Sequence, residues 1–194
     1  DIVIGNPPYV QLQKDGGALA KLYQTYKYET FERTGDIYSI FYEKGFKLLK
    51  KKGVLCFITS SQWMKASYGK SLRKYFLTQN PLRLILLGPG VFESATVDTN
   101  ILVASQEENS NELVAGVVQN TVQLEALNDL PLQPMSYVSQ ESWAVMSGAK
   151  LLISETIKAV AKPLSKWDIN IYRGVLTGYN EAFILDEKLS CLKS

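Results

Sequence analysis

The residues best suited to chemistry are Asn6, Pro7, Pro8 and Tyr9, which directly follow the apolar segment Asp1–Ile4. The Asn6 amide oxygen and the Pro7 carbonyl are both acceptors, so together they can bind the two hydrogens of a planar amine. The two prolines fix φ and have no N–H, which presents these acceptors in a rigid loop. Tyr9 offers a flat face on which a base can stack. Such a site would direct the lone pair of the amine at an electrophile without a general base. The alternative interpretation is structural: a proline-rich turn in which Asn6 is a local cap.

The 194 residues include no histidine. This excludes Ser-His-Asp and Cys-His catalysis and HExxH zinc sites within the chain. The two cysteines, Cys56 and Cys191, form neither a disulfide framework nor a metal cluster, so no metal site is expected and a reducing compartment fits. No apolar run approaches the roughly 20 residues of a membrane-spanning helix, and no targeting peptide is visible. The expected location is therefore the cytoplasm, without membrane contact.

Alternating apolar runs predict an α/β fold with a mostly parallel sheet. The first strand would end at Ile4, which places Asn6 at the carboxyl end of a strand, where ligands bind in open α/β sheets. Asp36 is expected to cap the helix that follows it. The predicted strands are 1–4, 54–58, 82–87, 100–105 and 113–118, and the predicted helices are 16–28, 36–49, 60–77 and 149–161.

Charge differs between the two halves of the chain. Residues 1–105 hold 14 Lys and Arg against 8 Asp and Glu, a balance of +6, whereas residues 106–194 have a balance of −4. The basic half is either an ordinary solvated surface or a surface that meets phosphate. Trp63, Met64 and Lys65 follow a predicted strand end and could line a DNA-binding face, with core packing as the equal alternative.

The segment DIVIGNPPYV at 1–10 resembles motif IV of amino-group methyltransferases that use S-adenosylmethionine. The ordered motifs of the chain resemble those of TaqI-like adenine-N6 DNA methyltransferases of type II restriction-modification systems. These motifs are GDIYSIFYEKGFKLLKKKGVLCFITSSQWMKASYGKSLRKYFL at 35–77, GVFESATVDTNILV at 90–103 and YRGVLTGYNEAFILD at 172–186.

The resemblance implies the C-terminal half of a Rossmann-like methyltransferase sheet, followed by the start of a mainly β target-recognition domain. The expected division is a catalytic domain at 1–162 and an incomplete recognition domain at 163–194. Asn6 and the Pro7 carbonyl would accept from the N6 amine of a flipped adenine in double-stranded DNA. Tyr9 would stack on that base, and Phe92 would pack against its other side or edge. The cofactor would be S-adenosylmethionine.

The chain departs from the family pattern where the cofactor should bind. A glycine loop and an acidic strand end are expected upstream of motif IV, that is upstream of Asp1, so the chain is expected to be a fragment that is inactive alone. A fused upstream nuclease or a separate restriction subunit is the implied partner. Thr177, Gly178, Asn180 and Phe183 match the family without an assigned role.

Three other functions stay open on the sequence. Protein-glutamine N5 methyltransferases share Asn-Pro-Pro-Tyr but lack a long region after the last sheet strand, and 106–194 argue against them. Cytosine-N4 methylation would use the same mechanism, although serine more often replaces Asn6 there. A DNA-binding module that has lost its activity would keep the same scaffold, but the intact Asn-Pro-Pro-Tyr motif argues against such a loss.

Overall fold

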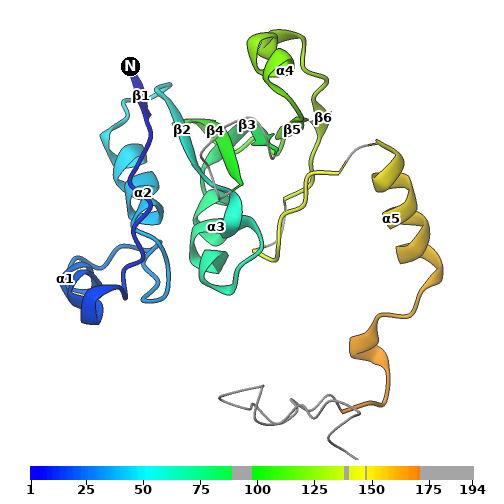
Figure 1. Ribbon diagram of the computed structural model, residues 1–194, viewed down its shortest axis with the longest axis horizontal. Helices are drawn as coiled ribbons and strands as arrows, with labels where there is room; N and C mark the ends of the chain where they lie inside the picture. Colours follow the sequence, from blue (N-terminus) through cyan, green and yellow to red (C-terminus); the bar gives the residue numbers. More distant parts are fainter. Residues whose placement is uncertain (89–97, 138–139, 147, 171–194) are drawn as a thin grey trace, which may run out of the picture. The chain divides into compact units, whose positions relative to one another are not determined.

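The six strands of the described structure form one mixed sheet in the order β1-β2-β4-β3-β5-β6 (Figure 1). The structure, a computed structural model, describes residues 1–88, 98–137, 140–146 and 148–170. The strands are β1 (Ile2–Gly5), β2 (Val54–Ser60), β3 (Asn80–Leu87), β4 (Thr99–Ser105), β5 (Val114–Val118) and β6 (Gln133–Pro134). The predicted α/β class is confirmed.

Two of the strand pairings are parallel, β1 with β2 and β3 with β5. β4 lies between β2 and β3 and is antiparallel to both. The expectation of a mostly parallel sheet was therefore wrong for β4. The connection from β3 to β4 spans only residues 88–98, which is too short for the crossover that a parallel neighbour needs. β1, β2, β3 and β5 still run in one direction, so their carboxyl ends share one edge of the sheet.

The four predicted helical regions occur in the predicted order, but one of them is broken, and Thr121–Glu125 form a helix that was not predicted. The continuous helix predicted over 60–77 is instead two 3₁₀ turns and a short α-helix, with a break at Lys65 and Ala66. Gly69 permits this turn, because a Cβ there would lie 1.9 Å from the Trp63 carbonyl oxygen. The α-helices are α1 (Ala18–Gln24), α2 (Tyr38–Leu48), α3 (Lys70–Phe76), α4 (Thr121–Glu125) and α5 (Gly148–Val160). The 3₁₀ helices are η1 (Asp15–Gly17), η2 (Ser61–Met64), η3 (Ser67–Gly69), η4 (Leu127–Asp129) and η5 (Leu164–Lys166).

The two faces of the sheet are covered by different elements. On one face α2 and α3 pack through large aromatic side chains, including Tyr42, Phe46 and Phe76, against Leu55 and Leu102. On the other face, α4 and the residues after it cover a smaller cluster. Its buried members are Ile85, Leu87, Val118 and Leu130. Burial on both faces explains why β2, β3 and β4 are almost continuously apolar.

The chain divides into two compact units, Asp1–Ile153 and Ser154–Ser194. The functional boundary expected after residue 162 stays a prediction, and most of the expected recognition domain lies outside the described residues. No helix among the described residues is both long and apolar enough to cross a membrane.

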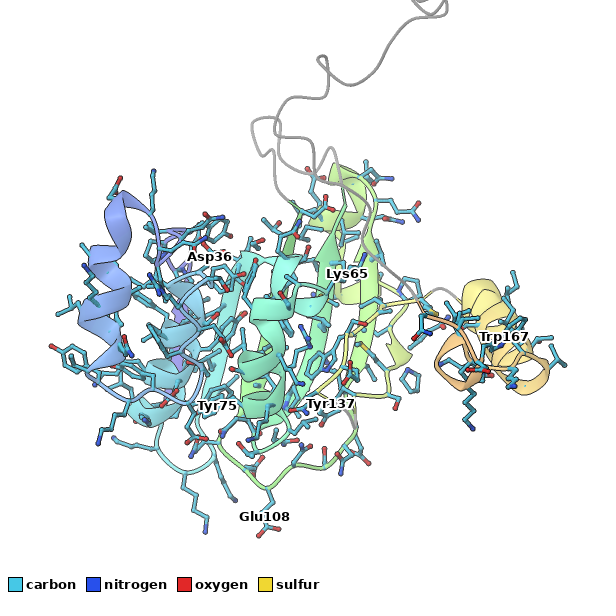
Figure 2. All side chains as sticks on the ribbon, turned by 90° about the horizontal axis from the view of Figure 1, so that it is seen from below. Asp36, Lys65, Tyr75, Glu108, Tyr137 and Trp167 are labelled. Carbon is cyan, nitrogen blue, oxygen red and sulfur yellow. The ribbon has the colours of Figure 1, made fainter. Side chains whose placement is uncertain are left out.

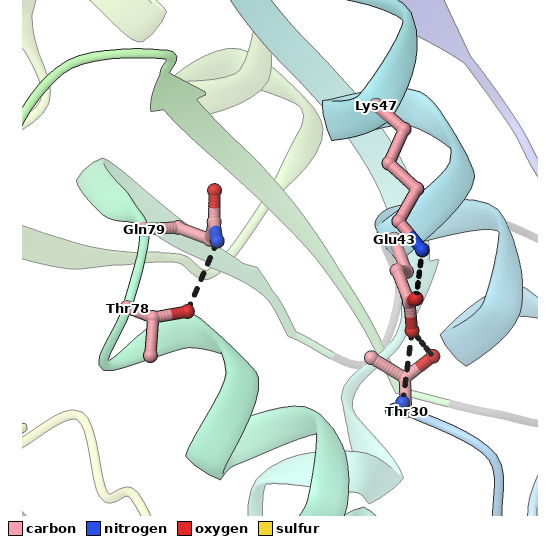
Figure 3. A network of polar contacts seen from close by, with 5 residues as sticks. All are labelled: Thr30, Glu43, Lys47, Thr78 and Gln79. Carbon is pink, nitrogen blue, oxygen red and sulfur yellow. Dashed lines mark hydrogen bonds and ion pairs between the residues drawn. The ribbon is translucent and has the colours of Figure 1, made fainter. Parts of the chain in front are cut away.

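A buried carboxylate anchors the segment before α2 onto that helix (Figure 3). Glu43 and Thr30 are both fully buried. The Thr30 backbone N–H and hydroxyl donate to Glu43 Oε2 at 3.0 and 3.1 Å, and Lys47 Nζ donates to Oε1 at 2.5 Å. The carboxylate thereby accepts a hydrogen bond from a buried backbone N–H that water does not reach.

Glu43→Gln should loosen this segment, because the amide can present a donor where the Thr30 N–H needs an acceptor. Loss of a buried hydrogen bond costs about 1–3 kcal/mol. Hydrogen exchange of peptides covering residues 26–34 in the intact protein should therefore accelerate, whereas the exposed substitution Glu29→Gln should leave it unchanged. Equal exchange in the Glu43→Gln variant and the wild type would contradict this role.

Candidate functional site

Asn6–Tyr9 leave the sheet at the carboxyl end of β1. Gly5 pairs with Phe57 of β2 and is the last residue of the strand, so Asn6 is the first residue beyond it. The Asn6 side chain is exposed, whereas Pro7 is buried. Residues 6 and 7 therefore lie at the sheet edge that was expected from the sequence.

Both proposed acceptors are unused within the described part of the chain. No described residue donates a hydrogen bond to the Asn6 amide oxygen or to the Pro7 carbonyl. The hydrogen bonds that hold this loop begin later, at Val10. A ligand that bonded to either oxygen would therefore not have to break a bond within the described residues.

Tyr9 is partly packed and partly open. Its side chain is 42% exposed. Its ring meets the ring of Tyr38 edge-on, with centroids 6.0 Å apart and planes at 78°. Partial burial raises the pKa of the Tyr9 phenol, so the ring is neutral around neutral pH. A neutral, half-open ring is a suitable surface for stacking.

The segment after Tyr9 is paired with the start of α2. The Ile37 N–H donates to the Val10 carbonyl at 3.0 Å, and the Leu12 N–H donates to the Gly35 carbonyl at 2.9 Å. Gln11 and Asp36 form an antiparallel bridge between them. Asn6–Tyr9 is thus held at one end by β1 and at the other by the residues that lead into α2.

Asp36 does not cap α2 as predicted. No side chain caps that helix, and the Asp36 carboxylate instead accepts a hydrogen bond from the Tyr68 hydroxyl. Burial raises the pKa of Asp36, and the bond from Tyr68 lowers it in part. The capping prediction was wrong because the pairing with Gln11 turns the residue towards η3.

A cavity of about 310 Å³ lies beside Asn6 on the side of β1 that faces α2. Asn6, Pro7 and Pro8 form one wall of it. Phe41 and Leu48 of α2 line it and are 39% and 62% exposed, although both are large apolar residues. Ile2 and Ile4 of β1, which is an edge strand of the described sheet, are 73% and 77% exposed.

A second cavity of about 280 Å³ lies along the same sheet edge, between η2 and the ends of β3 and β4. Lys65 lines it and is exposed, whereas Trp63 and Met64 are buried. Figure 2 shows Lys65 and Asp36 towards one edge of the sheet, and Tyr75 and Tyr137 towards the other. Core packing therefore accounts for Trp63, whereas Met64 and Lys65 both line the cavity, and of these two only Lys65 is exposed.

Several expected residues cannot be placed. Phe92, Thr177, Gly178, Asn180 and Phe183 lie outside the described residues. Among the residues that are described, no three His, Cys, Asp or Glu side chains gather as a metal site would require. Of the predicted site residues that are described, Asn6, Pro7 and Tyr9 share one loop, and Asn6 and Pro7 line the same cavity.

Tyr38 and Tyr68 are neighbours of the site that the sequence analysis missed. The only local signal was the segment Gly35-Asp36-Ile37-Tyr38, which was interpreted as a helix start. Tyr68 lies 30 residues beyond Tyr38, so its proximity depends on the tertiary structure.

The chain is similar to known proteins of restriction-modification systems. Residues 1–90 match the family described as Eco57I restriction-modification methylase. The chain is 33% identical over 116 residues to "Type II restriction enzyme and methyltransferase RM.Eco57I" of Escherichia coli, covering 57% of the chain and 12% of that protein. It is 25% identical over 205 residues to "Type II methyltransferase M.PaeR7I" of Pseudomonas aeruginosa, covering 96% of the chain and 35% of that protein.

A solved structure shares the fold. The DrdV–DNA complex, determined by cryo-electron microscopy, superposes with a TM-score of 0.58 at 16% identity, over 76% of the chain and 18% of that structure. The match of residues 1–90 to the Eco57I restriction-modification methylase family and the similarity to the two type II proteins confirm the resemblance to the methyltransferases of restriction-modification systems. The chain spans between about an eighth and a third of the two curated relatives described above.

Asp36→Asn should change how stability depends on pH. A carboxyl whose pKa is raised on folding stabilises the fold fully below its ordinary value near 3.8, and this stability is lost as pH rises through the folded-state pKa. The difference in melting temperature, Asp36→Asn minus wild type, should therefore be larger at pH 7.5 than at pH 3.5.

Tyr68→Phe supplies the matched comparison. It removes the hydrogen bond that lowers the Asp36 pKa. The benefit of Asp36→Asn at pH 7.5 should therefore be larger in the Tyr68→Phe background. A difference in melting temperature that stays constant with pH would be inconsistent with burial of this carboxyl.

Proposed function

We propose that this chain carries the catalytic part of an enzyme that transfers a methyl group from S-adenosylmethionine to the N6 amine of a flipped adenine in a specific DNA sequence. The observation that carries the proposal is the pair of unused acceptors, on Asn6 and Pro7, beside the half-exposed ring of Tyr9. The match of residues 1–90 to the Eco57I restriction-modification methylase family supports it.

The Asn6 amide oxygen and the Pro7 carbonyl would each accept one N–H of the exocyclic amine. Two acceptors in the plane of those hydrogens draw the nitrogen lone pair out of conjugation with the ring and direct it along the remaining axis. S-adenosylmethionine supplies an electrophilic methyl group when it is bound. The exposed position of Asn6 at the end of β1 leaves that axis accessible, and neither residue has to remove a proton before the attack.

Tyr9 would hold the adenine while the acceptors align its amine. Stacking on an aromatic ring stabilises a base by about 1–3 kcal/mol, which offsets much of the few kcal/mol needed to extrude it from the duplex. Phe92 is proposed to contact the other side or edge of the base.

The cofactor is proposed to lie close to the wall formed by Asn6, Pro7 and Pro8. The 310 Å³ cavity beside these residues is lined chiefly by apolar side chains and could hold only part of such a molecule. The glycine loop and acidic strand end that complete a cofactor site are proposed to come from sequence that precedes motif IV. Residues 1–162 would then be the catalytic part and 163–194 the start of the recognition domain.

Double-stranded DNA is the proposed partner. The proposed location of the protein is the cytoplasm. The basic balance of residues 1–105 favours phosphate contacts, and Lys65 lies at the same sheet edge as Asn6. A fused nuclease or a separate restriction subunit would complete the restriction-modification system.

Asn6→Ala in the full-length protein should lower kcat for methyl transfer by about 10²–10³, which is the loss typical of removing one donor or acceptor that stabilises a transition state. Tyr9→Ala should lower the rate by roughly 5- to 150-fold through lost stacking, whereas Tyr9→Phe keeps the ring and most of the activity. Radiolabelled methyl incorporation into unmethylated phage DNA measures all three.

Gln13→Ala is the control, because Gln13 is exposed a few residues beyond the motif. It should retain full activity, and both Gln13→Ala and Asn6→Ala should bind DNA as tightly as the wild type. Wild-type activity in Asn6→Ala would refute the proposed role of this loop.

A further inference from the structure

Tyr38, the first residue of α2, is fully buried and lies against the ring of Tyr9. The two rings meet edge to face, with 6.0 Å between their centroids and 78° between their planes. An edge-to-face contact is a preferred geometry for aromatic pairs and restricts rotation of the more exposed ring. Tyr9 therefore has a fixed wall on its inner side, while 42% of its side chain remains exposed.

The orientation of Tyr38 is itself set by a chain of hydrogen bonds. The Tyr38 hydroxyl lies 3.4 Å from the Tyr68 hydroxyl, and Tyr68 donates to the Asp36 carboxylate. Asp36 is two residues before Tyr38 and is bridged to Gln11, two residues after Tyr9. The contacts thus form a closed loop that connects the backbone around Tyr9 with the ring that touches it.

A purely structural role does not explain the Tyr38 hydroxyl. A phenylalanine would fill the same space among the apolar neighbours, and burial of a hydroxyl is costly unless it is hydrogen-bonded. Here the hydroxyl is bonded to Tyr68, which is half-buried. Tyr68 is bonded in turn to Asp36, whose backbone is bridged to Gln11 just after the Asn6–Tyr9 loop. The bond therefore fixes the direction of the Tyr38 ring as well as satisfying a polar group.

We propose that Tyr38 is a positioning residue, which acts through Tyr9 to hold that ring in the plane required for stacking on the substrate base. Tyr68 assists by fixing Tyr38. The proposal rests on the proposed function, since it assigns Tyr9 to the substrate. Tyr38 is not expected to touch the base, because no part of its side chain is exposed.

A double-mutant cycle in the full-length protein tests this. Tyr38→Leu removes the ring wall and should lower kcat about tenfold in the wild-type background, as expected when a reacting group is misplaced. In the Tyr9→Ala background it should cause no further loss, because the group it positions is absent. The KM for S-adenosylmethionine should be the same in all four proteins.

Tyr75→Leu controls for damage to the core. Tyr75 is also a buried tyrosine, and its ring centroid lies 5.9 Å from that of Phe46. It forms no ring contact with Tyr9 or Tyr38 in the described structure. Any loss that it causes should be the same in the wild-type and Tyr9→Ala backgrounds. An equal loss from Tyr38→Leu in both backgrounds would assign Tyr38 to the core and overturn the proposal, as would full activity in Tyr38→Leu.

Conservative variants keep the test decisive if Tyr38→Leu does not fold. Tyr68→Phe and Tyr38→Phe each remove the bond between the two hydroxyls with little change in volume. Each should lower kcat about two- to threefold in the wild-type background and not at all with Tyr9→Ala. Loss of the same size in both backgrounds, or no loss in either, would overturn the positioning role. If instead Tyr9→Ala alone has wild-type activity, the proposed function fails at Tyr9.

Discussion

The pairing of Val10–Leu12 with Gly35–Ile37 is the interaction on which the arrangement of the site depends. β1 ends at Gly5, and a loop that left the sheet freely could place Asn6 and Tyr9 in many orientations. Two backbone hydrogen bonds return the chain to the start of α2 and leave only four residues, 6–9, between two fixed points. Two of the four are prolines, so the loop has few remaining conformations. Its free acceptors are therefore held in place before any ligand arrives.

The sheet determines what this loop can reach. β1, β2, β3 and β5 run in the same direction, so Asn6, Lys65 and the two cavities lie around one edge. The placement of β4 antiparallel between β2 and β3 brings residues 88 and 98 to that edge as well. The sheet thus presents the Asn6–Tyr9 loop and the basic side chain of Lys65 from separate elements at the same edge.

Much of the fold and the centre of the site could be predicted because they depend on local sequence. The apolar runs of β2 to β5 mark buried strands, and the loop 6–9 carries its own chemistry. The break at Lys65–Ala66 was missed because Met64, Tyr68 and Leu72 keep helical spacing across it, while the close approach of Gly69 to Trp63 is tertiary. Exposure of Phe41 and Leu48 and the contacts of Tyr38 with Tyr9 and Tyr68 likewise depend on which elements meet in space.

The most direct test of the account is the identity of the methylated product. The full-length protein is incubated with unmethylated DNA and S-adenosylmethionine, and the DNA is digested to nucleosides for mass spectrometry. The expected product is N6-methyladenine, formed about 10²–10³ times more slowly by the Asn6→Ala variant. N4-methylcytosine would keep the role of the loop but contradict the assigned base, and the absence of any methylated nucleoside would contradict DNA methylation as the function of this site.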